Sequence, residues 1–163
     1  MKRYSSAARL ALAVLVVLGI TGAVTAGEHR HFKGNLEGDV VITPLAPPFV
    51  SVLVEATGKA THLGKFTLDI PHVVNAANGT AIGSYEFTAA NGDTLTADFT
   101  GTATPTAKPG VLAIVETATI TGGTGRFAGA TGSFTTKRLF NTVTGRTSGS
   151  FNGTISSPGD DDE

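Results

Sequence analysis

The stretch TITGGTGRFAGATGSF, residues 119–134, places five glycines between two strand-like runs. Gly122, Gly123 and Gly125 remove three Cβ atoms within four positions, which permits positive φ and a tight reversal of the chain. Phe127 follows directly and is the only large apolar side chain beside these glycines, so we expect it to fill a core. The stretch therefore predicts a sharp structural turn.

The same glycines also match the loose dinucleotide-binding fingerprint, as Gly123-x-Gly125-x-x-Ala128. That fingerprint needs a helix directly after it, because the helix N-terminus binds the pyrophosphate. Residues 126–134 are rich in Gly, Thr and Phe and show no helical period, and the chain has no Gly-Lys-Ser/Thr sequence for a phosphate loop. A structural turn is the preferred interpretation.

The rest of the chain after residue 33 has the texture of an all-β protein. Short runs rich in Val, Ile, Thr and Phe alternate with Gly, Asn, Pro and Asp, and no sustained 3.6-residue period occurs. The expected strands are 36–43, 49–57, 61–74, 80–90, 94–104, 111–121, 126–141 and 144–155. Asn91-Gly92 is a strong hairpin signal between two of them. Eight consecutive strands without a crossover helix predict an antiparallel up-and-down β-barrel, with a sandwich as the alternative.

Residues 122–127, followed by 130–132, resemble the Gly-Gly-Thr-Gly-x-Phe-x-x-Ala-x-Gly signature of dirigent proteins. They are also similar to the matching stretch of plant allene oxide cyclases and of bacterial secreted proteins with an allene-oxide-cyclase-like barrel. The resemblance implies an eight-stranded antiparallel β-barrel, and it implies a barrel that guides cyclisation or radical coupling of a reactive guest. No catalytic residue of either plant family lies in the matched dozen residues, so none is transferred to this chain.

Residues 1–26 are expected to be a cleaved signal peptide. Lys2, Arg3 and Arg9 form a basic start, residues 10–20 form the apolar stretch, and residues 24–26 supply the small residues of a cleavage site. The alternative is a transmembrane anchor, for which the apolar run is too short. We therefore expect a secreted or periplasmic protein that is not embedded in a membrane after cleavage.

The predicted mature chain consists of a lead-in at residues 27–35, the barrel domain at 36–156 and an acidic tail at 157–163. Removing residues 1–26 takes away three of the 12 Lys and Arg and none of the 13 Asp and Glu, which leaves a net charge of −4. Residues 160–163 account for that excess, so the body is near neutral and no nucleic-acid partner is expected. The chain has no cysteine, which excludes disulfides, thiolate metal sites and thiol nucleophiles.

Strand alternation predicts four polar side chains on otherwise apolar inward faces: His62, His72, Glu116 and Arg138. A buried charge needs a partner, so Glu116 and Arg138 are expected to pair inside the barrel. With the hydroxyl of Tyr85, these groups form a candidate site for the head group of a small, mostly apolar ligand. The alternatives are an ion pair with a purely structural role and a bulge that turns Glu116 outward.

Cleavage after Ala26 would expose Gly27-Glu28-His29 as a new N-terminus. A free amine, two deprotonated amides and the imidazole of a third-position histidine offer four nitrogens in a plane, which suits Cu(II) or Ni(II). Three-residue matches also arise by chance, so this metal site is a hypothesis. The acidic tail at 160–163 offers weak cation binding as an alternative to a plain solvated end, and no cofactor is expected.

Three functions remain open on the sequence alone. The barrel binds a small ligand, it guides the cyclisation or coupling of a reactive molecule, or it is a structural domain of the envelope with a filled interior. A packed interior would favour the third, and a cavity faced by Glu116 and Arg138 would favour the first two. Turnover of a reactive substrate would then separate an enzyme from a binding module.

Overall fold

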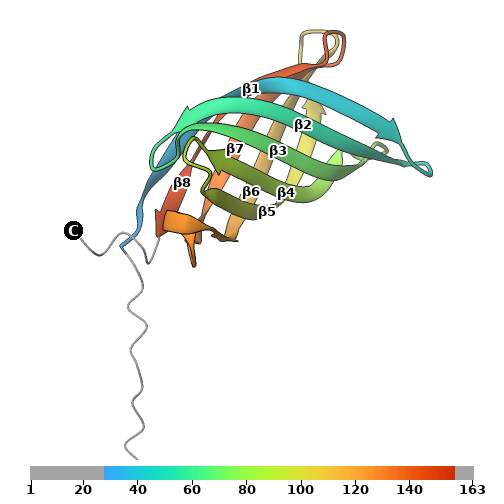
Figure 1. Cartoon of the computed structure of the whole chain (residues 1–163). Helices are drawn as coiled ribbons and strands as arrows, with labels where there is room; N and C mark the ends of the chain where they lie inside the picture. Colours follow the sequence, from blue (N-terminus) through green and yellow to red (C-terminus); the bar gives the residue numbers. More distant parts are fainter. Residues whose placement is uncertain (1–27, 157–163) are drawn as a thin grey trace, which may run out of the picture.

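Eight antiparallel strands, joined in sequence order, close on themselves in the computed structural model, which describes residues 28–156 (Figure 1). The strands are β1 (Arg30–Pro44), β2 (Phe49–Ala60), β3 (Gly64–Asn75), β4 (Thr80–Ala89), β5 (Thr94–Pro105), β6 (Val111–Gly123), β7 (Thr131–Asn141) and β8 (Arg146–Ser156). Closure comes from the pairing of β1 with β8. The predicted eight-stranded antiparallel barrel is therefore confirmed. The signal peptide at 1–26 and the acidic tail at 157–163 lie outside the described residues.

The first strand is longer than the sequence indicates. It begins at Arg30 instead of Leu36, and Arg30 pairs with Ile155 of β8, so most of the segment predicted as a lead-in belongs to the barrel. Phe32 in this segment is fully buried. Gly34 takes the inward position between Phe32 and Leu36, and it interrupts the apolar alternation that marks a strand.

The glycine-rich stretch connects β6 to β7. Gly122 and Gly125 adopt φ of 139° and 57°, and a single 3₁₀ turn, η1 (Gly125–Phe127), places Phe127 in the core with 2% of its surface exposed. The predicted strand 126–141 was wrong at its start, because β7 begins only at Thr131. One 3₁₀ turn is no pyrophosphate-binding helix, which rules against the dinucleotide fingerprint.

One half of the barrel is filled by phenylalanine rings. Neighbouring rings lie with centroids 4.9–6.2 Å apart, mostly edge to face or tilted. The rings are those of Phe32, Phe66, Phe87, Phe134 and Phe151. Small inward residues make room for them: a Cβ on Gly34 would lie 2.6 Å from the Phe151 ring. This half of the barrel is a packed core that stabilises the fold.

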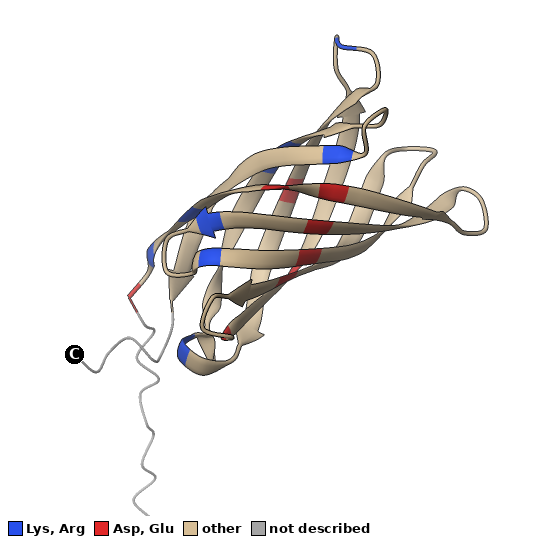
Figure 2. Ribbon diagram, turned by 45° about the horizontal axis from the view of Figure 1, so that its top comes forward, with Lys and Arg blue, Asp and Glu red and all other residues tan. Residues whose placement is uncertain are grey.

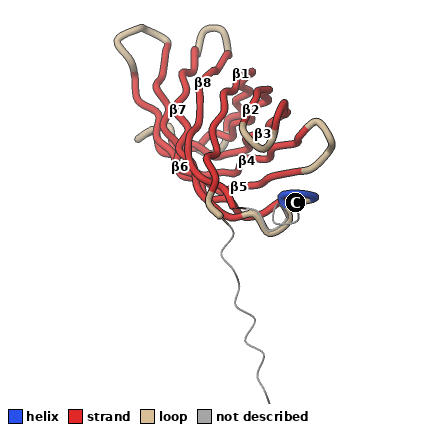
Figure 3. The backbone as a smooth tube through the Cα atoms, turned by 90° about the vertical axis from the view of Figure 1, so that its left-hand side faces the viewer, coloured by secondary structure: helices blue, strands red, loops and turns tan. Residues whose placement is uncertain are grey.

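The two ends of the barrel differ. The connections 45–48, 76–79, 106–110 and 142–145 lie together at one end, which we call the hairpin end. The opposite end carries the other connections, including η1, together with the first residues of β1 and the last residues of β8 (Figure 3). Inward side chains near the hairpin end, such as Val40, Val50, Val74 and Ala81, are only partly buried. No helix within residues 28–156 is long and apolar enough to cross a membrane.

Candidate functional site

A carboxylate and a guanidinium meet inside the barrel, on the side of the phenylalanine core that faces the hairpin end. Arg138 of β7 donates from Nη2 to Oε1 of Glu116 at 2.6 Å, and from Nε to Oε2 at 3.1 Å. Only 1% of Glu116 and 4% of Arg138 is exposed. The predicted interior pair is present, and its two-pronged geometry is the strongest form of such a pair.

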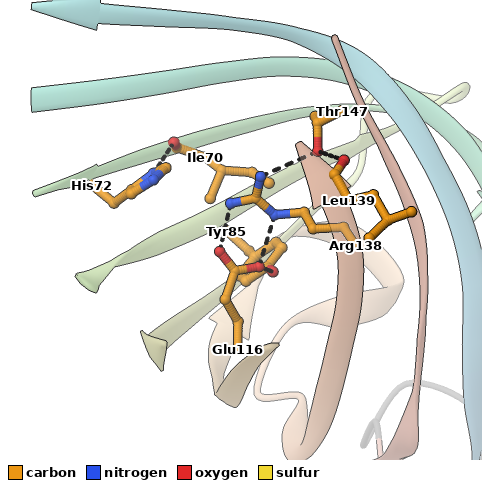
Figure 4. Close-up of polar contacts among 7 residues, drawn as sticks. All are labelled: Ile70, His72, Tyr85, Glu116, Arg138, Leu139 and Thr147. Atoms are coloured by element: carbon orange, nitrogen blue, oxygen red, sulfur yellow. Dashed lines mark hydrogen bonds and ion pairs between the residues drawn. The ribbon is translucent and has the colours of Figure 1, made fainter. Parts of the chain in front are cut away.

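Two hydroxyl groups extend the pair across the lumen (Figure 4). Tyr85 of β4 donates its phenolic proton to Oε2 of Glu116 at 2.5 Å. Arg138 donates from Nη1 to Oγ1 of Thr147 at 3.2 Å, and Thr147 in turn donates to the carbonyl of Leu139 at 2.9 Å. Four strands thus contribute to one hydrogen-bonded network.

His72 of β3 lies beside this network. Its Nδ1 is 2.9 Å from the carbonyl oxygen of Ile70, which only accepts, so Nδ1 carries the proton and Nε2 is left as an acceptor. Burial lowers the pKa of His72, and the positive charge of Arg138 lowers it further, while the Ile70 carbonyl and Glu116 oppose both. At neutral pH this imidazole is therefore uncharged.

Tyr85 is held in its protonated form. Burial raises its pKa well above 10.0, and the negative charge and hydrogen bond of Glu116 raise it further. The hydroxyl of Thr136 opposes this rise, but it makes no hydrogen bond of good geometry and is the one buried hydroxyl of residues 28–156 without a partner. The site therefore holds a phenol that donates to a carboxylate, with the buried hydroxyl of Thr136 near the phenol.

Arg138 has donor capacity to spare. A guanidinium carries five N–H groups, and the hydrogen bonds to Glu116 and Thr147 use three of them. Within the described part of the chain, one N–H on Nη1 and one on Nη2 have no acceptor. Figure 4 shows this end of the guanidinium directed across the lumen, toward the side on which His72 lies.

His62 does not belong to the site. It lies exposed in the turn between β2 and β3, with φ of +65°, and the neighbouring Leu63 is buried in its place. The prediction that His62 faces inward was wrong because it extended β3 back to Thr61, whereas the strand begins at Gly64. The other four predicted residues, His72, Tyr85, Glu116 and Arg138, all face inward and are buried.

Packing decides how much of the interior is open. Tyr85, Phe87, Ala97 and Ala118 have no exposed surface, so no water-sized space touches them. Inward residues toward the hairpin end keep some exposure, and we call this region the mouth: Val40, Val50, Val74, Ala81 and Leu112. The polar network forms its floor. Grooves of about 910, 630 and 360 Å³ lie on the outer face, and none of them includes a network residue.

The predicted N-terminal metal site falls only partly on described residues. Gly27 lies outside them, while Glu28 and His29 are exposed. Within residues 28–156 no group of three His, Asp or Glu side chains is arranged to hold a metal ion. Copper or nickel binding by Gly27-Glu28-His29 stays a prediction.

Sequence reasoning missed two threonines of the site: Thr147, which belongs to the network, and Thr136, which lies near Tyr85. Both fall on inward positions of their strands, in phase with Arg138 and Phe151. The chain is rich in threonine on outward faces as well, so an inward threonine carried no distinguishing signal. Only the hydrogen bond from Arg138, on the neighbouring strand, identifies Thr147 as part of the site.

No protein-family model matches this sequence, and no curated protein matches it. Solved structures do match. The pterocarpan synthase dirigent protein GePTS1 superposes with a TM-score of 0.57 at 14% identity, covering 91% of this chain and 97% of that one. The pterocarpan synthase dirigent protein PsPTS1 gives a TM-score of 0.58 at 11% identity, covering 80% of this chain and 96% of that one. The chain has the eight-stranded barrel fold of dirigent proteins.

Proposed function

We propose that this protein binds a small, mostly apolar molecule in the mouth of its barrel, with the polar network fixing one polar group of that molecule. The observation that carries the proposal is the unused donor capacity of Arg138, a charged side chain buried beneath apolar walls. Burial of a charge costs free energy, and a charge placed beneath an apolar mouth supplies the specificity that apolar walls lack.

The chemistry of the floor indicates what that polar group is. The free N–H groups of Arg138 require an acceptor, and Nε2 of neutral His72 requires a donor. A carbonyl or hydroxyl oxygen satisfies the guanidinium, and a neighbouring hydroxyl proton satisfies the imidazole. Glu116 and Tyr85 hold the guanidinium in place and do not themselves need the ligand.

A second function, guidance of a reactive molecule through cyclisation or coupling, is favoured by the fold shared with dirigent proteins. In that case the mouth would hold the guest in one folded shape, and the network would bind its reacting oxygen. The third alternative is a structural domain with a filled interior. The phenylalanine rings support it only for the half of the barrel that they fill.

Native mass spectrometry of the protein purified from its own source tests the binding proposal. A co-purifying molecule of a few hundred daltons is the expected result. The matched variant is Glu116→Leu/Arg138→Met, which removes both charges together and so leaves no unpaired ion. It should keep the barrel, as judged by circular dichroism, and lose the molecule. A folded double variant that retains the molecule, or a wild-type protein without any, would overturn the proposal.

A further inference from the structure

The exposed apolar side chains of this barrel are not scattered. The large hydrophobic residues with substantial exposure within residues 28–156 all lie toward the hairpin end: Val41, Ile42, Leu45, Phe49, Leu53, Val73, Ile82, Val115, Leu139 and Val143. Exposure reaches 83% for Val143 and 65% for Ile82. Apolar groups gathered in one place on a protein surface mark a site of interaction.

Six of these residues form what we call the apolar collar, because they point outward from strands on both sides of the barrel. They are Val41, Leu53, Val73, Ile82, Val115 and Leu139, on β1, β2, β3, β4, β6 and β7. Val41 pairs directly with Leu53, and Val73 with Ile82. Leu53 and Val73 are diagonal neighbours on β2 and β3, because Leu53 lies opposite Pro71. The tips of two hairpins add Leu45 and Val143 beyond it.

Charged residues are also distributed unevenly between the hairpin end and the rest of the barrel. The segments 40–54, 70–85, 99–115 and 138–147, which make up the hairpin end, contain no aspartate or glutamate. Their surface charges are Lys108 and Arg146, and Arg146 is paired with Asp39 at 3.2 Å. Exposed Lys137 lies directly opposite Val115, at the edge of this zone. This end of the molecule is apolar, and apart from the Arg146–Asp39 pair its surface charges are the two lysines Lys108 and Lys137.

A row of carboxylates ends the apolar zone on one side of the barrel. Asp39, Glu55, Asp69 and Glu86 lie directly opposite one another on β1 to β4, and Figure 2 shows them as a stripe across the strands. Asp39 is two residues from Val41 on the same face, a separation of about 7 Å along a strand. Like charges in a row destabilise a sheet unless water solvates them, so this row has to remain in water.

We propose that the hairpin end docks on the surface of a lipid bilayer and is immersed as far as the carboxylate row. A flat protein partner covers one side of a barrel, whereas the collar faces outward on both the β1–β4 side and the β6–β7 side. A lipid bilayer that surrounds the hairpin end would remove all six collar residues from water at once. Apolar burial is also what holds amphipathic helices in the bilayer interface.

Apolar burial is the driving force, so a zwitterionic surface is sufficient for docking and no anionic lipid is needed. The mouth of the barrel opens at the same end, so an apolar molecule would pass between bilayer and barrel without crossing water. The docking depends on the collar alone and stands whether or not the interior binds a ligand.

Co-sedimentation with phosphatidylcholine vesicles tests this proposal. The protein used is residues 27–163, which contains all eight strands and lacks the apolar segment at 10–20 that would bind lipid by itself. Binding is expected at low salt and unchanged in 1 M NaCl, because apolar contacts are not screened. A failure of the wild-type chain to sediment would overturn the proposal.

The collar variant is Leu139→Asp/Val143→Asp, and the matched control is Ser133→Asp/Ala128→Asp. Both place one aspartate on the outer face of β7 and one in an exposed loop, but the control residues lie at the opposite end. The collar variant should partition at least about tenfold less, because a charged carboxylate replaces each of two aliphatic side chains that the bilayer would bury. Equal loss in both variants would contradict the proposal.

Light scattering on the wild type and the two double variants tests whether a second copy of this chain, instead of lipid, binds to the collar. A monomeric wild type that binds vesicles supports docking on lipid. An oligomeric wild type that ignores vesicles, and that the collar variant converts to monomer, would assign the collar to self-assembly and overturn the proposal.

Discussion

Glu116 and Arg138 lie one step apart across the β6–β7 ladder, since Glu116 is opposite Thr136 and Arg138 is opposite Ile114. The guanidinium nevertheless reaches back along the strands and makes two hydrogen bonds to the carboxylate. The two N–H groups of Arg138 that Glu116 and Thr147 do not use are directed across the lumen, toward the side on which His72 lies (Figure 4).

Removing one member of this pair should cost far more than removing both. Glu116→Leu leaves a buried cation without its counter-charge, for which we expect a loss of about 3–5 kcal/mol in the free energy of unfolding. Glu116→Leu/Arg138→Met should recover most of that loss, because apolar side chains of similar volume fill the space. Urea denaturation followed by circular dichroism measures both. Additive losses in the double variant would show that the two charges do not interact.

Tyr85 should resist ionisation until the barrel opens. It is the only tyrosine after residue 26, and the chain has no tryptophan, so absorbance at 295 nm reports on Tyr85 alone in residues 27–163. Its pKa is raised well above 10.0 in the folded state, so its contribution to stability is present below pH 10 and is lost as pH rises above it. The phenolate signal should therefore appear together with unfolding. A reversible titration near pH 10 in the folded protein would contradict the buried hydrogen bond to Glu116.

Stability should fall on the acid side because of His72. Its pKa is lowered from 6.5 by burial, so the unfolded chain takes up a proton that the folded chain resists, and stability is lost as pH falls below 6.5. The slope reaches at most about 1.4 kcal/mol per pH unit for one group. His72→Gln should flatten the profile between about pH 7 and pH 5. His62→Asn, in the exposed turn, is the control and should leave the profile unchanged.

The turn between β6 and β7 should be sensitive to its glycines and to Phe127. Phe127→Ala removes a buried ring and should cost about 3–5 kcal/mol. Gly123→Ala should also destabilise, because a Cβ there would meet the carbonyl oxygen of Thr94 and the Cβ of Phe127. Ala128→Ser, one residue further along on an exposed position, is the control. Thermal unfolding midpoints that do not separate Phe127→Ala from this control would argue against a core role for Phe127.

Much of the site could be predicted because strand alternation is local. Tyr85, Glu116 and Arg138 keep phase with apolar neighbours on their own strands, so their inward direction follows from a period of two. The same reasoning gave the wrong direction for His62. It assumed a strand at that position, whereas β3 begins at Gly64. A positive φ at a non-glycine residue is set by the turn, and no pattern in the neighbouring residues indicates it.

The amino-acid sequence by itself determined the class of fold, the number of strands and the sides on which most residues lie. These follow from alternation, from turn residues and from the glycine stretch before Phe127, which are properties of neighbours in the chain. The tertiary structure alone decided which strands close the barrel, which threonines join Glu116 and Arg138, and that the exposed apolar residues gather at one end. Those facts depend on contacts between residues far apart in the chain, and such contacts come into being only when the sheet closes.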